Sequence, residues 1–354
     1  MEQANQLSGM LDLIIRPAFA VIDGRIQYCN CAARQCMIPE NIQVAQLLKD
    51  SAEEYRDFSG GCLYLTLWIE DQPLGASVTR MDGFDVFILE EEAEEPQLQA
   101  LALAAKELRE PLSNLMIAAN RLHAQDKIET PEMQLMKKSF YRMLRLIGNM
   151  SDAARYTNQA RPHQQLQDAP AFIAEIFEKA AVLAEQAGIT LTFHNHCDTV
   201  ITLLDGEKLE RGIYNMLSNA IKFSEKGSRI DASLSRKGNK LFLTVTDYGR
   251  GIPSDLMGSV FSRHLRQPGM EENRHGIGLG MFMIRSAASA HGGTVLIEKG
   301  KDAGTKLTMT LSIRKDLQGN LSSDFLYPDY TGELDHALIE LADILPADTF
   351  NQFR

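Results

Sequence analysis

The sequence predicts an α+β protein with several domains, on three observations. A first region is rich in short strands, two long amphipathic helical stretches follow it, and a third region alternates helices with strands. A chain of 354 residues is long enough for two or three domains that each bury a core. The expected domains are residues 1–94, 95–160 and 168–315, followed by a tail, residues 316–354, with a short helix.

The first region is expected to form a five-stranded antiparallel sheet. Residues 18–22, 25–29, 62–70, 75–81 and 84–90 are apolar or β-rich, and the pairs Asp23-Gly24 and Asp82-Gly83 suit tight turns between strands. A short helix is expected over residues 31–37. The region therefore predicts a small α/β module.

Two amphipathic helices are expected next, over residues 97–123 and 131–156, after an acidic linker that ends at Pro96. The second helix should turn one set of apolar residues inward: Met136, Phe140, Met143, Leu144, Ile147 and Met150. Each helix has a wide apolar stripe that one hairpin is too small to cover. We therefore expect a homodimer in which two antiparallel hairpins, spanning residues 97–156, form a four-helix bundle.

The third region is expected to place helices on one face of a mixed sheet. The expected helices are residues 170–188, 206–223 and 281–291, and the expected strands are residues 190–194, 200–204, 229–236 and 240–247 with two closing strands. In the tail, residues 334–345 suit a helix that packs on a neighbouring domain.

The composition argues against nucleic acid and membranes as partners. The formal net charge is -11, so attraction to phosphate backbones or anionic lipid is weak. Residues 10–22 form the best apolar run, but Asp12, Arg16 and Pro17 interrupt it, and no secretory signal peptide is recognised. We therefore expect a cytoplasmic protein without a membrane span.

The five cysteines are expected to be reduced thiols. They are few and scattered for a chain of this length: Cys29, Cys31, Cys36, Cys62 and Cys197. The first three form a C-x-C-x4-C cluster, for which a metal or redox site stands as the alternative to small core residues. A fourth ligand at the customary spacing is missing, which favours the core.

The first candidate binding motif lies on the helix expected at residues 206–223. Asn215 and Asn219 are four residues apart and share one face, where an amide oxygen can ligate a hard cation. Lys222 follows about one turn later and can meet a phosphate, and Phe223 ends the motif. In isolation such a pair is more often a capping or surface feature.

The second motif, at residues 247–253, follows a strand. A carboxylate at a strand end, Asp247, can accept from an exocyclic amine. Gly249 and Gly251, followed by Ile252, let the backbone turn close to a planar base. Taken alone, the motif would be read as a glycine turn.

The third motif, at residues 275–281, opens a helix. Gly276, Gly278 and Gly280, with Leu279 between the last two, can leave backbone amides accessible at a helix N-terminus, which suits a polyphosphate. A Rossmann site is excluded because no strand directly precedes this loop and no acidic residue ends a strand about 20 residues later.

In this order the three motifs resemble the N, G1 and G2 boxes of the ATPase superfamily that histidine kinases, DNA gyrase and MutL share, and Gly304-Thr305-Lys306-Leu307 resembles its last glycine box. The resemblance implies an α/β sandwich that binds ATP and Mg2+. It implies that Asn219 ligates Mg2+, that Asn215 and Lys222 approach the phosphates, and that Asp247 recognises adenine. The remaining implied nucleotide contacts are Phe223, Gly249, Gly251, Ile252, Gly276, Gly278, Leu279, Gly280 and Thr305.

Residues 253–274 would form the mobile lid of such a domain. Within them, residues 260–263 read Val-Phe-Ser-Arg and resemble the Phe-bearing box of histidine kinases. Four basic side chains of the lid could neutralise triphosphate charge, with solvated lid charges as an equal alternative: Arg263, His264, Arg266 and Arg274.

The order of expected elements in the first region, with residues 19–26 running into residues 28–30, resembles a PAS sensory domain. The alternative is a generic small α/β dimerisation module, because PAS domains share shape far more than residues.

The phosphoacceptor box of histidine kinases reads His-Glu-Leu-Arg-x-Pro-Leu, and residues 106–112 read Lys-Glu-Leu-Arg-Glu-Pro-Leu. Every fixed position but the first fits, so Lys106 replaces the acceptor histidine. An exposed lysine with a pKa of about 10.4 is almost wholly protonated near neutral pH and is a poor nucleophile. Glu107 resembles the family's acid/base residue but has no acceptor to serve, and Glu110 stands where many relatives place Thr or Asn. His123 would lie roughly 25 Å further along the helix, too far to substitute.

The sequence thus favours a histidine-kinase-like protein that binds Mg-ATP and works as an atypical or pseudo-kinase in a two-component pathway, with a response regulator or an intact histidine kinase as partner. An active sensor kinase that uses another acceptor, or that acts in trans, is the alternative. An ATP-driven clamp like gyrase or MutL is a third hypothesis, against which the paired helices and the negative charge weigh.

Overall fold

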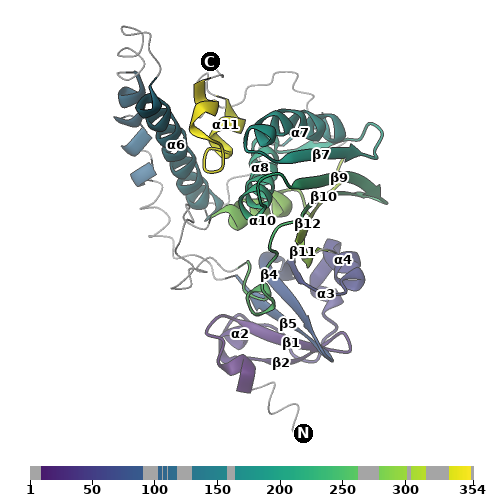
Figure 1. The fold of residues 1–354 in the computed structure, drawn as a ribbon. Coiled ribbons are helices and arrows are strands. Elements are labelled where there is room, and N and C mark those ends of the chain that lie inside the picture. The colour runs from purple at the N-terminus through teal and green to yellow at the C-terminus, as the bar shows by residue number, and fades with distance from the viewer. Residues whose placement is uncertain are drawn as a thin grey trace.

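The computed structural model describes residues 9–90, 103–105, 107–109, 111–117, 130–157, 164–261, 279–300, 304–315 and 335–351. Several sequence-based predictions lie outside these residues: Lys106, Glu110, His123, Arg263, His264, Arg266, Arg274, Gly276 and Gly278. We call residues 9–90 the N-terminal module, residues 164–315 the helix–sheet domain, and residues 335–351 the C-terminal segment. In Figure 1 the module and the helix–sheet domain are stacked, with the long helix α6 (Pro131–Thr157) beside the latter.

The N-terminal module contains the five-stranded antiparallel sheet that the sequence predicted. Its strands are β1 (Ala18–Ile22), β2 (Arg25–Cys29), β3 (Cys62–Ile69), β4 (Gln72–Met81) and β5 (Phe84–Leu89), in the order β2-β1-β5-β4-β3. Short helices follow β2: α2 (Cys31–Gln35), α3 (Ala45–Leu48), the 3-10 helix η1 (Lys49–Ser51) and α4 (Ala52–Asp57). Asn30 starts α2, because its side chain accepts from the Ala33 amide at 2.8 Å while its own amide group donates to carbonyls of residues 11–16.

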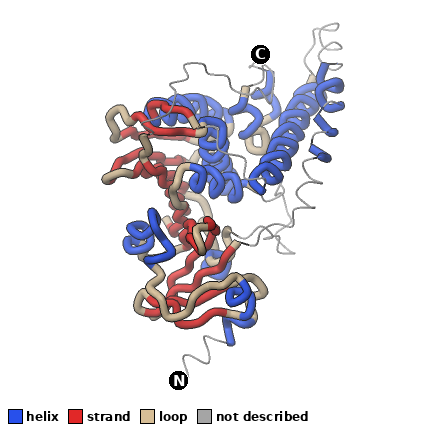
Figure 2. Tube along the Cα trace, turned by 180° about the vertical axis from the view of Figure 1, so that it is seen from behind, coloured by secondary structure: helices blue, strands red, loops and turns tan. Residues whose placement is uncertain are grey.

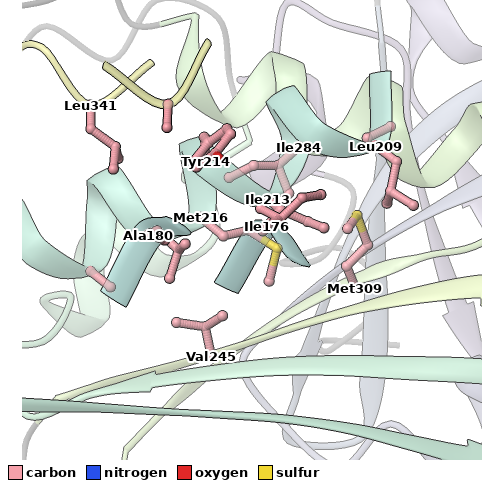
Figure 3. Packing of buried hydrophobic residues seen from close by; sticks show 14 of the residues in the cluster. Ile176, Ala180, Leu209, Ile213, Tyr214, Met216, Val245, Ile284, Met309 and Leu341 are labelled. Carbon is pink, nitrogen blue, oxygen red and sulfur yellow. The ribbon is translucent and has the colours of Figure 1, made fainter. Parts of the chain in front are cut away.

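The helix–sheet domain has the predicted mixed sheet with helices on one face. Strand β7 (Thr190–Asn195) is parallel to β9 (Arg229–Lys237), and the other pairs are antiparallel: β9 with β10 (Lys240–Asp247), β10 with β12 (Thr305–Ser312), and β12 with β11 (Val295–Lys299). Helices α7 (Ala169–Gln186), α8 (Gly206–Phe223) and α10 (Gly280–Ala290) cover the sheet. Figure 3 shows their apolar side chains facing Val245 and Met309 of the strands.

One strand of this domain lies apart from the main sheet. Strand β8 (Ile201–Leu204) pairs with β6 (Gln165–Asp168) in a separate two-stranded sheet. The bend that leads from β8 into α8 is fixed by Asp205, whose side chain accepts from the amide of Lys208 at 3.1 Å and so caps the helix. The start of α8, and with it the first candidate motif, is therefore positioned locally.

The sheet of the N-terminal module and the main sheet of the helix–sheet domain join into one sheet, which the sequence did not predict. Strand β3 of the N-terminal module pairs antiparallel with β11 of the helix–sheet domain, with Leu63 opposite Leu296, so that a single ten-stranded sheet runs through both (Figure 2). Each edge strand thereby satisfies backbone groups of the other. Side chains add to the contact: the ring centroids of Tyr64 and Phe261 are 5.6 Å apart, and Arg285 forms an ion pair with Glu90.

Helix α6 buries part of the apolar set predicted to face inward. Phe140, Leu144 and Ile147 are buried, whereas Met136 and Met143 are 43% and 42% exposed on the single chain. Their expected inward position is therefore not observed within one chain. Pieces of the preceding helix are described at residues 103–105, 107–109 and 111–117. Among the described residues, no helix is both long and apolar enough to cross a bilayer.

The C-terminal segment lies between α6 and the helices α7 and α8 (Figure 1). It consists of α11 (His336–Glu340), a turn, and the 3-10 helix η2 (Ala347–Asn351), so its regular helix is shorter than the predicted 334–345. Its apolar residues belong to the same core as α8: Ala337, Leu338, Ile339, Leu341, Ala342, Leu345 and Phe350. The segment is therefore packed into the protein.

Replacing Arg285 by Met should lower the free energy of unfolding by about 3 kcal/mol, because it leaves the Glu90 carboxylate without its buried partner. The side chains of Arg285 and Glu90 are 4% and 17% exposed. Lys179→Ala is the matched control: it breaks the exposed Glu175–Lys179 pair and should cost less than about 0.5 kcal/mol. Urea unfolding followed by circular dichroism measures both, and equal losses would contradict a structural role for the Arg285–Glu90 pair.

Candidate nucleotide-binding site

The described parts of the three candidate motifs meet along the C-terminal half of α8. A Cβ atom added to Gly280 at the start of α10 would lie 3.2 Å from Oδ1 of Asn215 and 3.8 Å from Oδ1 of Asn219. On the other side, the backbone amide of Arg250, in the loop after β10, donates to the carbonyl of Phe223 at 3.4 Å. The structure thus brings the helix motif into contact with the described parts of both glycine motifs.

Asp247 is directed toward the helix-covered face by the pleat of β10. Every second residue of this strand is buried, and the alternation that contains Leu243 and Val245 continues to Asp247, which is 7% exposed. Its Oδ1 accepts from the amides of Gly249 at 3.0 Å and Thr305 at 3.1 Å. Burial raises the pKa of this carboxyl, and the hydrogen bonds from Gly249 and Thr305 oppose the rise. A carboxylate oriented in this way can accept from an amine.

Two glycines allow the backbones around Asp247 to approach one another. A Cβ on Gly249 would clash with the carbonyl oxygen of Phe223, and a Cβ on Gly304 would clash with the carbonyl oxygen of Asp247. The end of α8, the loop after β10 and the start of β12 are therefore in direct contact, which only a residue without a side chain permits. Gly251 and Ile252 continue this loop and are partly buried.

The other end of the site is polar and positively charged. Asn219 is partly buried, and its amide donates to Sδ of Met281 at 3.7 Å, beside the N-terminus of α10. Desolvation lowers the pKa of Lys222; the Asp343 carboxylate opposes this effect, and the guanidinium groups of Arg145 and Arg142 add to it. This end could hold phosphate groups and a hard cation on the Asn219 oxygen.

Asn215 is held in a network that the sequence did not predict. Its side chain is 1% exposed: Oδ1 accepts from Nη2 of Arg145 at 3.1 Å, and Nδ2 donates to the carbonyl of Arg211 at 2.8 Å and to Glu340 Oε2 at 3.4 Å. The amide that was expected near the phosphates is therefore engaged by α6 and by the C-terminal segment.

The residues that sequence reasoning missed come from distant parts of the chain. Arg142 and Arg145 share a face of α6, where basic residues at this spacing resemble a solvated surface, and Glu340 and Asp343 lie in a tail whose role could not be read. Nothing local marks these residues as neighbours, because the pairs between them join positions about 200 residues apart in sequence. The available signal was that two basic residues of α6 and two acidic residues of the C-terminal segment have the same spacing of three positions.

Glu107, the expected acid/base residue, lies on a short described helical stretch and is exposed. Among the described residues, no hydrogen bond joins Glu107 to the site. Leu279 and Thr305 lie at the start of α10 and of β12, respectively.

Comparison with known families identifies the domain that carries this site. Residues 204–315 match the family described as "Histidine kinase-, DNA gyrase B-, and HSP90-like ATPase". The match begins at the last residue of β8, ends after β12, and includes Asn215, Asn219, Asp247 and Gly280. These residues form an α+β ATPase domain of that class, which implies nucleotide binding.

The likeness extends beyond this domain to sensor kinases. The chain is 28% identical over 249 residues to the adaptive-response sensory kinase SasA of Synechocystis sp., covering 65% of this chain and 64% of that relative. It is 25% identical over 243 residues to the hybrid signal transduction histidine kinase D of Dictyostelium discoideum, covering 65% of this chain and 16% of that relative. The chain is a relative of two-component sensor histidine kinases. It spans 64% of the length of the Synechocystis protein and 16% of the length of the Dictyostelium protein.

The fold agrees with a solved kinase structure. Full-length ShkA in complex with AMPPNP superimposes with a TM-score of 0.51 at 20% sequence identity, covering 62% of this chain and 47% of ShkA. At this level of identity the agreement concerns the fold alone.

Proposed function

We propose that this protein is a histidine-kinase-like signalling protein that binds Mg-ATP but lacks the phosphoacceptor histidine, and that it regulates a two-component pathway as an atypical or pseudo-kinase. The observation that carries the proposal is that Gly280 lies beside Asn219, and Gly249, next to Asp247, lies against Phe223 at the end of the same helix, in a chain that has Lys106 at the acceptor position.

The residues present fit a nucleotide at both ends of the site. At one end the Asp247 carboxylate is oriented by two backbone amides, and Gly249 and Gly304 let the surrounding backbone segments pack directly beside it. We assign adenine to this end. At the other end, Asn219 and Lys222 would hold the phosphates and Mg2+, which would supply positive charge to the triphosphate.

Phosphotransfer to Lys106 is disfavoured by chemistry. A neutral imidazole offers a lone pair near pH 7, whereas a lysine ammonium must first lose a proton that it binds tightly. Without an acceptor, the protein would act through its conformation on a partner, for which we propose a response regulator or an intact histidine kinase.

We assign the N-terminal module to the PAS class of sensory domains. The strand order β2-β1-β5-β4-β3, with short helices between β2 and β3, supports the assignment. These helices pack on the sheet face that carries Phe19, Leu65 and Phe87, and together they enclose a core of their own. The module would sense a signal and pass it to the ATPase domain through the shared sheet.

Full-length protein should sediment as a homodimer at micromolar concentration, because α6 and the described helical pieces before it leave apolar side chains exposed. These exposed side chains are Leu103, Leu108, Leu115, Ile117, Leu135, Met136 and Met143. Met143→Glu should shift the protein toward the monomer. Val182→Glu, at an apolar residue of α7 that is 53% exposed, is the control and should remain dimeric. A wild-type monomer at micromolar concentration would refute the dimer.

Isothermal titration calorimetry should show Mg-ATP binding with a dissociation constant of about 1 mM or tighter. Asp247→Asn keeps an oxygen for the two backbone amides but presents an amide to the adenine amine, so it should weaken binding by at least about ten-fold. Asn219→Ala should weaken binding in the presence of Mg2+. Asp198→Asn, at an exposed carboxylate of the same domain, should have no effect. Absence of ATP binding by the wild type would remove the assignment.

Labelled ATP should leave no acid-labile phosphate on the wild-type protein, and Lys106→His should gain it, because the rest of the box is present. The double variant Lys106→His/Asn219→Ala should lose the gain. Acid-labile labelling of the wild type would instead indicate an active kinase with another acceptor, and labelling of an added intact kinase would indicate action in trans.

A further inference from the structure

The carboxylate of Asp343, in the C-terminal segment, is surrounded by cations at the phosphate end of the candidate site. Its Oδ1 accepts from Nε of Arg142 at 3.0 Å, and its Oδ2 accepts from Nη1 of Arg145 at 2.9 Å. Desolvation lowers the pKa of Lys222, and the Asp343 carboxylate opposes this effect. One carboxylate therefore lies among three positively charged side chains.

The position of Asp343 is set by the packing around it. On either side, Leu341 and Leu345 are fully buried in the core. The carbonyl of Leu345 accepts from Nζ of Lys138 at 2.6 Å, and the ring of Phe350 lies 4.9 Å from that of Tyr141. Apolar burial thus anchors the segment independently of Asp343, whose side chain is itself 15% exposed.

The same cations face the proposed nucleotide site. Arg145 uses Nη1 for Asp343 and Nη2 for Oδ1 of Asn215, which lies next to Gly280 at the N-terminus of α10. The guanidinium of Arg145 therefore bridges the Asp343 carboxylate and Asn215 of the N box. Because α6 supplies both arginines, the phosphate end of the site includes a helix outside the ATPase domain.

In the part of the chain that the structure describes, the ion pairs of this cluster join three arginines to two carboxylates. Arg142, Arg145, Arg211 and Lys222 are the cations, whereas Glu340 and Asp343 are the carboxylates that pair with the arginines. The Nε atom of Arg145 is buried without a hydrogen bond, 3.6 Å from Glu340 Oε2. A cluster of several cations favours a highly charged anion, and arginine forks match the geometry of phosphate oxygens.

We propose that Arg142, Arg145 and Lys222 form a subsite for the terminal phosphate of the nucleotide, and that Asp343 occupies this subsite as an intramolecular competitor. The inference rests on the proposed ATP binding and adds to it two ligands from α6 and an acidic stand-in from the C-terminal segment. Because competition is reciprocal, ATP displaces the Asp343 carboxylate and the carboxylate weakens ATP. ADP lacks the terminal phosphate and competes far less.

The test is calorimetry of the full chain with Mg-ATP and Mg-ADP. Asp343→Asn removes the competing charge but keeps the shape of the side chain, so ATP affinity should rise about ten-fold, while ADP affinity changes by less than about two-fold. Asp348→Asn, at an exposed carboxylate of the same segment, is the matched control and should change neither.

Adding Arg142→Gln to the Asp343→Asn variant distinguishes two explanations of a gain in affinity: that Arg142 contacts the phosphate, or that the C-terminal segment has become loosened. If Arg142 contacts the phosphate, the double variant should lose most of the ten-fold gain for ATP. If Asp343→Asn acted only by loosening the segment, Arg142→Gln would leave the gain intact, and the subsite would be refuted.

The outcomes distinguish this inference from the proposed function. If the wild type binds ATP and Asp343→Asn binds it equally well or more weakly, the subsite alone is overturned. Failure of every variant, Asp343→Asn included, to bind either nucleotide overturns the nucleotide site and the subsite together.

Discussion

The packing of α8 across the sheet is the constraint on which the rest of the site depends. One side of this helix is buried against α7, α10 and the strands, where Leu209, Ile213 and Tyr214 are fully buried (Figure 3). That packing fixes the rotation of the helix, and the rotation decides where Asn215 and Asn219 point. Residues four apart on a helix lie on one face, so both amides are directed at the start of α10 together.

A second constraint comes from the sheet. Strand β10 ends in Asp247, and the period of two along the strand places its carboxylate on the same side as Val245. The helix face and the strand face therefore meet at one edge of the domain. The backbones approach closely there because Gly249 and Gly304 have no side chains. The site therefore depends on the helical period of α8, on the strand period of β10, and on the absence of side chains at Gly249 and Gly304.

Two other parts of the chain attach to this domain at different places. The N-terminal module joins its sheet through β3 and β11 and contacts α10 through the Arg285–Glu90 pair. The C-terminal segment joins α6 to α8 through Glu340 and Asp343. Helix α10 begins at Gly280 in the candidate site and carries Arg285 at the module, so it physically connects the N-terminal module with the candidate site.

The elements of the helix–sheet domain could be predicted from local patterns. Helix α8 has the predicted bounds because Asp205 is a strong N-cap, and β10 has them because its alternation is regular up to Asp247. The pairing of β3 with β11 could not be predicted, since either strand reads equally well as an edge. The network around Arg145 and Asp343 was also out of reach, because its members are polar residues whose partners lie far along the chain. Met136 and Met143 fit the helical stripe, but a stripe does not reveal whether the same chain or a second copy covers it.

The most direct measurement of the central claim is a crystal structure of the full chain with Mg2+ and a non-hydrolysable ATP analogue. The account predicts the adenine amine within hydrogen-bonding distance of Asp247, the metal on the side-chain oxygen of Asn219, and the phosphates at the N-terminus of α10. A nucleotide bound elsewhere, or adenine at Asp247 with its phosphates directed away from Asn219, would contradict it.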